Sequence, residues 1–168
     1  YIYNLTGPSS VYESLKNPEK ISQEITGIFD NLINSLIDAK NFPNFFQASS
    51  SEMFGDNGKG YQDEYGEFVP NSPYAVSKLK VHNKIQNLRE EYDWNFISGI
   101  MFNHESELRG DEYLIMKIIK HAKNLSHNNE KLTLGSLDYV RDWSFAGDIA
   151  KSMLLLNESN LNEDIVIG

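Results

Sequence analysis

The sequence has 168 residues, of which 40% are hydrophobic and 12% aromatic, enough for one globular domain with a sizeable core. A formal net charge of -9 argues against a nucleic-acid backbone as partner, because that role needs clustered Lys and Arg side chains. The absence of cysteine excludes disulfides and thiolate chemistry. The chain shows neither a signal-peptide pattern nor a run of the roughly 20 apolar residues that cross a membrane, so we expect a soluble cytoplasmic protein.

The first forty residues predict a strand, a turn and a long helix. Residues 1–5 are a short apolar run that ends at the polar turn 6–10. In residues 18–40 apolar side chains recur every three or four positions, as in an amphipathic helix. The stripe consists of Ile21, Ile25, Ile28, Phe29, Leu32, Ile33, Leu36 and Ile37. We expect this stripe to face the sheet.

A buried strand and a long loop come next. The hydrophobic run 42–46 leads into a small-residue segment that ends at Glu52, which predicts a strand delivering hydroxyls and a carboxylate at its C-terminal end. In open α/β sheets, ligands bind at that end of the strands. Residues 53–71 are rich in Gly, Asp, Asn and Glu and predict a loop over the site. The glycine-rich run 55–60 is interpreted as a turn, since polar residues and not a helix follow it.

Tyr74 and Lys78 are the first candidates for proton chemistry. They are four residues apart in a predicted helix 73–92, so they share a face, and Ser72 with Pro73 suits the start of that helix. A phenol has a pKa of about 10, and we expect the nearby ammonium group to lower it. The same spacing is also common on solvated helix faces, so the motif alone decides nothing.

The remaining elements alternate between strands and helices. We predict strands at 94–102, 131–135 and 165–168, and helices at 113–125 and 145–156. In the helix 113–125 the predicted inner face is Ile115, Ile118, Ile119 and Ala122. This alternation predicts an α/β fold with a doubly wound, Rossmann-like parallel sheet.

Several blocks of sequence, in order along nearly the whole chain, resemble one family. The longest reads Gly-Ile-Met-Phe-Asn-His-Glu-Ser-Glu-Leu-Arg-Gly at residues 99–110, and the others are 3–5, 134–138 and Arg141-Asp142-Trp143. Together with Tyr74, Lys78 and the segment 47–52, they resemble the extended short-chain dehydrogenase/reductase family of nucleotide-sugar enzymes. Within that family the resemblance is to the GDP-mannose 4,6-dehydratases.

The resemblance implies a set of site residues. The catalytic residues would be Ser50, Glu52, Tyr74 and Lys78. The cofactor, NADP or alternatively NAD, would contact Leu5, Thr6, Gly7, Ser9, Tyr74, Lys78, His104 and Arg109. The nucleotide-sugar substrate would contact Ser10, Asn103 and Arg141. Taken without the resemblance, His104 reads equally as a structural histidine, and Arg141 with Asp142 as a pair that only fixes a turn.

The resemblance also implies an internal redox cycle that yields a 4-keto-6-deoxy sugar. Tyr74 would take the C4 hydroxyl proton, with Lys78 and Ser50 assisting. Glu52 would remove the C5 proton and help to expel the C6 hydroxyl as water. An epimerase or reductase on the same scaffold would leave Glu52 idle, and the chain could also be an inactive folding fragment or interaction module.

Three positions depart from the family pattern. Relatives typically carry His where Ser10 stands, Thr at Ser50 and Pro at Glu107. We therefore expect altered substrate contacts at Ser10, and an extra carboxylate at Glu107 beside a phosphate site. The four histidines, His82, His104, His121 and His127, show no metal-ligand spacing with carboxylates, and we expect no metal.

Domain organisation and assembly follow from the same resemblance. No glycine-rich dinucleotide fingerprint occurs, so we expect an internal fragment that lacks about the first three strands of the fold. Residues 1–103 would belong to the cofactor-binding domain, and residues 104–168 would mix that domain with part of a smaller substrate domain. The resemblance further implies a homodimer, or a homotetramer, that pairs the helices 18–40 and 73–92.

Overall fold

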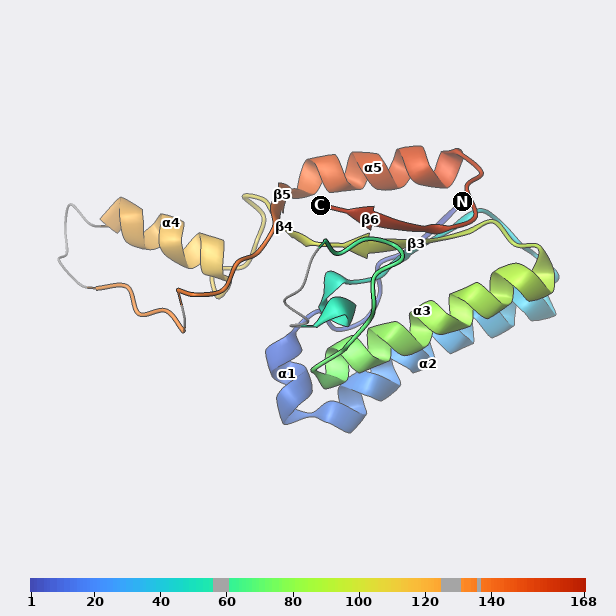
Figure 1. Ribbon diagram of the computed structural model, residues 1–168, viewed down its shortest axis with the longest axis horizontal. Coiled ribbons are helices and arrows are strands. Elements are labelled where there is room, and N and C mark those ends of the chain that lie inside the picture. The colour runs from blue at the N-terminus through green and yellow to red at the C-terminus, as the bar shows by residue number, and fades with distance from the viewer. Residues whose placement is uncertain (56–60, 125–130, 136) are drawn as a thin grey trace.

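The structure is a computed structural model that describes residues 1–55, 61–124, 131–135 and 137–168 (Figure 1). Strands and helices alternate along most of the chain. In chain order they are β1 (Ile2–Asn4), α1 (Val11–Lys16), α2 (Pro18–Asp38), β2 (Phe45–Ala48), the 3-10 helix η1 (Ser51–Phe54), α3 (Pro73–Tyr92), β3 (Phe96–Met101), β4 (Asn103–Glu105), α4 (Leu114–Asn124), β5 (Trp143–Phe145), α5 (Ala146–Glu158) and β6 (Asp164–Ile167).

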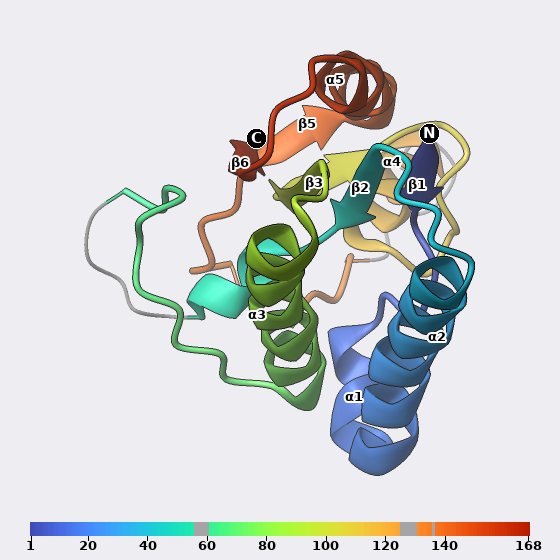
Figure 2. The same ribbon diagram turned by 90° about the vertical axis from the view of Figure 1, so that its right-hand side faces the viewer.

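A four-stranded parallel sheet with the strand order β1-β2-β3-β6 forms the centre of the molecule. Helices α2 and α3 pack on one face of the sheet and α5 packs on the other, as Figure 2 shows. A parallel sheet covered on both faces by its connecting helices is a doubly wound α/β fold. The predicted fold class is therefore confirmed, whereas the domain boundary at residue 103 stays a prediction.

Alternate side chains of β2 fill the two halves of the core. Phe45 points towards α2 and α3 and packs on Phe96 of β3, with 4.3 Å between the ring centroids. Phe46 points to the opposite face, where α5 covers it. Both rings are fully buried, and burial of each contributes about 1.5–3 kcal/mol. Residue 99 of β3 must be glycine for this packing, because a Cβ there would lie 2.2 Å from Cζ of Phe46.

Helix α2 matches the predicted amphipathic helix closely. Its stripe divides into a buried line, formed by Ile21, Ile25, Phe29 and Ile33, and a flank that is partly exposed. Ile28 on the flank is 39% exposed. The buried line shows that the stripe faces the sheet and α3, and the expected homodimer or homotetramer stays a prediction.

The strand predicted to reach Glu52 ends earlier, at Ala48. Ser50 interrupts it, because its hydroxyl oxygen accepts a hydrogen bond from the Glu52 backbone N–H at 3.2 Å and so starts η1. Hydroxyls and a carboxylate therefore do follow the strand, but they lie beyond its end. Glu52 itself lies in the 3-10 helix.

Two further predictions were wrong. Residues 131–135 form no strand, since no strand of the described chain pairs with them, and a strand exists only with a ladder partner. Helix α4 has no buried residue, and its predicted inner face includes Ile118 and Ile119, which are 39% and 40% exposed. Figure 1 shows the reason: α4 lies apart from the helices that cover the sheet.

One pairing escaped the sequence analysis. Strands β4 and β5 pair in parallel as a separate two-stranded sheet, with His104 opposite Ser144. This pairing brings residues 103–105, just after β3, beside the segment that leads into α5.

Some predictions concern residues that the structure does not describe. They are residues 56–60 of the predicted glycine-rich turn, the end of the predicted helix at residue 125, and His127. In the described part of the chain, no helix has the length and apolar character needed to cross a membrane.

A buried polar cluster ties α3 to two strands. His82 Nδ1 lies 3.0 Å from the Ser98 hydroxyl of β3, and His82 Nε2 lies 3.4 Å from the Asp164 carboxylate of β6. Arg89, also on α3, pairs with Asp164 at 2.8 Å and donates from Nε to the Phe96 carbonyl at 2.6 Å. Burial outweighs the attraction of Asp164 and lowers the pKa of His82 below its ordinary value of 6.5. The cluster therefore favours neutral His82.

The pH dependence of unfolding tests this assignment. Because the pKa of His82 is lower in the folded chain than in the unfolded chain, its stabilising contribution is complete above pH 6.5 and is lost as the pH falls below that value. We expect the free energy of unfolding, measured by urea denaturation between about pH 8 and pH 5, to fall less steeply in His82→Gln than in the wild type. His121→Gln, on α4, is the matched control. Equal slopes for His82→Gln and the wild type would contradict the assignment.

Candidate active site

A cavity of about 560 Å³ opens at the carboxyl ends of β1, β2 and β3. It collects all the residues predicted for the cofactor and for catalysis, and two of the three predicted for the substrate. They are Leu5, Thr6, Gly7, Ser9, Ser10, Ser50, Glu52, Tyr74, Lys78, Asn103, His104 and Arg109. Segments far apart in the sequence therefore meet where an open α/β sheet binds its ligands. The roles of these residues stay predictions.

Helix α3 presents Tyr74 and Lys78 to this cavity from one face. The helix begins as predicted, with the Ser72 hydroxyl accepting from the Ala75 N–H at 3.1 Å and Pro73 in the first position. Both side chains are only 7% exposed, which rules out the solvated helix face that the motif alone allowed. The Lys78 Nζ lies 5.7 Å from the Tyr74 ring centroid and donates to the Ala48 carbonyl at 2.9 Å.

The expected lowering of the Tyr74 pKa was wrong, because the pKa is raised. Burial raises the pKa of Tyr74 above its ordinary value of 10.0, and the nearby Glu52 carboxylate raises it further. A hydrogen bond with the Ser50 side chain acts in the opposite direction and favours the phenolate. Burial also lowers the pKa of Lys78 to about 8, so this lysine is mostly charged at neutral pH and loses its proton at mildly alkaline pH.

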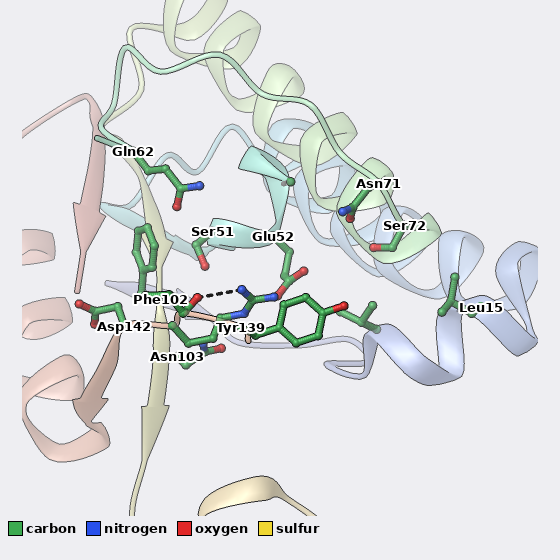
Figure 3. A pocket seen from close by; sticks show the side chains of 14 residues that line it. Leu15, Ser51, Glu52, Gln62, Asn71, Ser72, Phe102, Asn103, Tyr139 and Asp142 are labelled. Carbon is green, nitrogen blue, oxygen red and sulfur yellow. Dashed lines mark hydrogen bonds between the residues drawn. The ribbon is translucent and has the colours of Figure 1, made fainter. Parts of the chain in front are cut away.

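A second cavity, of about 520 Å³, adjoins the first (Figure 3). Glu52 and Asn103 line both cavities, whereas Arg141 lines only the second. The Arg141 guanidinium carbon lies 5.0 Å from the Tyr139 ring centroid, and its NH1 donates to the Val140 carbonyl at 2.9 Å. Arg141 thus has a cation–π contact to the ring and keeps further donors for a ligand.

The turn after β1 also lines the first cavity. The Thr6 hydroxyl donates to Asn4 Oδ1 at 2.5 Å, and Gly7 has a φ of 105°, a conformation that glycine adopts without strain. Ser10 caps α1 by accepting from the Glu13 N–H at 3.2 Å. Ser10 therefore combines a structural role with its predicted place beside the substrate.

Arg109 and His104 approach the cavity from the segment that follows β3. His104 Nδ1 lies 2.9 Å from the Phe102 carbonyl, which fixes the ring. The Arg109 guanidinium carbon lies 3.6 Å from the Tyr113 ring centroid, and Arg109 Nε lies 3.4 Å from the Glu105 carboxylate. The predicted extra carboxylate was misplaced: Glu105 lines the cavity, whereas Glu107 is exposed and does not. Sequence reasoning had no signal for the contribution of Glu105 and Tyr113.

Metal ligation finds no support in this geometry. Within the described ranges, no group of three or more His, Asp or Glu side chains is placed to hold a metal ion. The groups that meet in the cavities are instead phenols, a buried amine, an imidazole, hydroxyls, carboxylates and two guanidinium groups. They are suited to proton transfer and to the binding of anionic groups.

The fold and the Ser50, Tyr74 and Lys78 arrangement define an α/β protein of the extended short-chain dehydrogenase/reductase class. A family model described as GDP-mannose 4,6 dehydratase matches residues 1–168. The chain belongs to the GDP-mannose 4,6-dehydratase family.

Curated relatives agree with this family. A GDP-mannose 4,6-dehydratase from Vibrio cholerae is 34% identical over 170 residues, which is 99% of this chain and 46% of that protein. GDP-mannose 4,6 dehydratase 2 from Arabidopsis thaliana is 36% identical over 172 residues, with the same coverage of 99% and 46%. The chain spans about half the length of these relatives.

Solved structures share the fold at lower identity. A UDP-N-acetylglucosamine 4-epimerase from Methanobrevibacter ruminantium M1 has a TM-score of 0.89 at 24% identity, covering 100% of this chain and 54% of the epimerase. RMD from Pseudomonas aeruginosa, complexed with NADPH, has a TM-score of 0.88 at 22% identity, covering 98% of this chain and 58% of RMD. These likenesses establish the fold only.

Direct titration of Lys78 tests the environment of the site. We expect the Cε resonance of Lys78, in protein labelled with 13C-lysine, to titrate with a midpoint of about 8, because the ammonium group is buried. Lys78→Met should remove this resonance, whereas Lys80→Met, an exposed position on the same helix, should leave it in place. A midpoint near the ordinary value of 10.5 would show that Lys78 is solvated.

Proposed function

We propose that the chain carries the catalytic residues of a nucleotide-sugar 4,6-dehydratase that acts on GDP-mannose or a similar nucleoside-diphosphate hexose. The observation that carries the proposal is the position of Glu52 at the junction of the two cavities. The first cavity holds Ser50, Tyr74 and Lys78, and the second holds Arg141. An epimerase needs only the first set, whereas water loss needs a further acid/base group.

The first cavity fits a nicotinamide dinucleotide, NADP or NAD. Arg109 Nε is buried and pairs with the Glu105 carboxylate at 3.4 Å without forming a hydrogen bond, so the guanidinium group could still donate to a phosphate oxygen. The residues that would hold the dinucleotide include Thr6, Lys78, His104 and Arg109. When bound, the nicotinamide would take up a hydride from C4 of the sugar and return it at C6.

Tyr74 and Ser50 handle the proton at C4. The ionised Tyr74 accepts the proton of the C4 hydroxyl, and Ser50 assists because its hydrogen bond favours the phenolate. Burial disfavours the Tyr74 phenolate, and the hydrogen bond with Ser50 partly offsets this effect. Lys78 adds a titratable amine that holds a proton or releases it near neutral pH.

Glu52 carries out the elimination. Once C4 is a ketone, the proton on the adjacent C5 becomes acidic and passes to the Glu52 carboxylate. The same side chain then donates a proton to the C6 hydroxyl, which leaves as water as the C5–C6 double bond forms. Return of the hydride at C6 would leave an enolate, and C5 would then take up a proton that Glu52 relays from solvent. Arg141 in the second cavity binds the diphosphate of the substrate, for which a guanidinium fork is well suited.

The Glu52→Gln variant tests the elimination step. We expect the protein, expressed at the full length of its gene and supplied with NADP, to convert GDP-mannose to a product lighter by one water, with solvent deuterium incorporated at C5. Glu52→Gln should lower the rate of water loss by roughly 10²- to 10⁴-fold, since an amide cannot accept the proton. Reduction of the bound NADP, seen by its absorbance, should persist in this variant.

The matched control is Glu90→Gln, an exposed glutamate on α3 that should leave the rate unchanged. Unchanged water loss in Glu52→Gln would remove Glu52 from the mechanism. Wild-type protein that changes the mass of neither GDP-mannose nor any of a panel of other nucleotide sugars would refute the dehydratase proposal, and would favour an epimerase or an inactive relative.

A further inference from the structure

A continuous chain of hydrogen bonds links the rim of the first cavity to Lys78. At the rim, the Thr6 hydroxyl donates to Asn4 Oδ1 at 2.5 Å. Asn4 Nδ2 donates to Gln47 Oε1 at 2.7 Å, and Gln47 Nε2 donates to the Ala48 carbonyl at 3.1 Å. That carbonyl is also the acceptor for Lys78 Nζ, at 2.9 Å.

The two amides in the middle of this chain are buried and ordered by the sheet. Asn4 and Gln47 are each 3% exposed, and they are register partners in the pairing of β1 with β2. Since side chains alternate along a strand, both amides lie on the same face as Phe45, which is the face that α3 covers. Thr6, in contrast, is exposed and lines the cavity. The chain of bonds thus begins at a side chain that lines the cavity and ends at a buried lysine.

We propose that Asn4 and Gln47 are positioning residues of the active site, which fix the hydrogen bonding of Lys78 through the shared Ala48 carbonyl and couple it to the contact that Thr6 makes with a bound ligand. The proposal rests on the proposed function only in treating Lys78 as catalytic. The bonds themselves can be tested without substrate or cofactor.

The shared carbonyl acceptor determines the direction in which Gln47 changes the pKa of Lys78. Gln47 Nε2 and Lys78 Nζ donate to one carbonyl oxygen, so the two donors share its acceptor capacity. Removing the amide therefore leaves a better acceptor for the ammonium group, which favours the charged form. Loss of Gln47 should raise the pKa of Lys78.

Other titratable groups face the same region. On α3 they are Tyr74, one turn before Lys78, and His82, one turn after it. Glu52 of η1 and the Glu105 and Arg109 pair after β3 line the cavity that Lys78 faces. The variants below change none of these charges, so a shift in the titration of Lys78 reports on the hydrogen-bond chain.

The Gln47→Met variant provides the main test. Met is close to Gln in size but has no amide, and we expect the 13Cε titration of Lys78 to move up by roughly 0.4 to 1 pKa unit, the size of one net hydrogen bond. Gln23→Met, at an exposed position on α2, is the matched control and should not move it. A folded Gln47→Met protein with an unchanged Lys78 titration would overturn the proposal.

Substitutions at Thr6 test the far end of the chain and cannot disrupt the core, because Thr6 is exposed. Thr6→Val keeps the shape but removes the donor to Asn4, and we expect a measurable change in the Lys78 Cε chemical shift or titration. Thr6→Ser, which retains the hydroxyl, should restore the wild-type values. If Gln47→Met fails to fold, these variants decide alone: an unaffected Lys78 in Thr6→Val would overturn the proposal. Failure of the dehydratase assay would leave both results intact.

Discussion

Lys78 is a cation that the fold removes from water, and the arrangement of the site depends on how it is held. A buried ammonium group must be bound by polar atoms, and the Ala48 carbonyl at the end of β2 provides one. That contact places α3 against the carboxyl end of the sheet, so Tyr74, one turn earlier on the helix, meets Ser50 just beyond the same strand. The Ala48 carbonyl thus joins the carboxyl end of β2 to the helix that carries Tyr74 and Lys78.

The same helix is anchored by a second polar contact one turn further on. Tyr74, Lys78 and His82 are spaced by four residues and are all buried, so α3 presents a polar line to the sheet and not only an apolar one. Lys78 is bound to β2, and His82 lies between Ser98 of β3 and Asp164 of β6. Contacts to three strands fix the rotation of the helix about its axis more tightly than apolar packing alone, because hydrogen bonds depend on direction.

Features that depend on periodicity and on neighbouring residues, such as the limits of the helices, were predicted correctly from the sequence. Features that depend on contacts between distant segments were not. Helix α3 was predicted at its observed limits because Ser72 and Pro73 mark its start, and α2 because its apolar spacing is regular. The pairing of β4 with β5 joins residues about forty positions apart, and short-range patterns do not contain it. The Tyr74 pKa was predicted with the wrong sign because the spacing to Lys78 shows proximity, whereas burial depends on the whole fold. Asn4 and Gln47 lie in blocks that carry the family resemblance but were given no role, because their side-chain contact joins residues 43 positions apart and the sequence does not show it.

The electrostatic relation between Glu52 and Tyr74 orders the proposed proton transfers. The Glu52 carboxylate disfavours the Tyr74 phenolate, because two negative charges in a partly buried site repel each other. This repulsion is present before the C4 hydroxyl loses its proton, and it makes the phenolate a stronger base. It disappears once Tyr74 has taken that proton. In the proposed mechanism, Glu52 would then act on C5 beside a neutral phenol, so the first proton transfer would prepare the second.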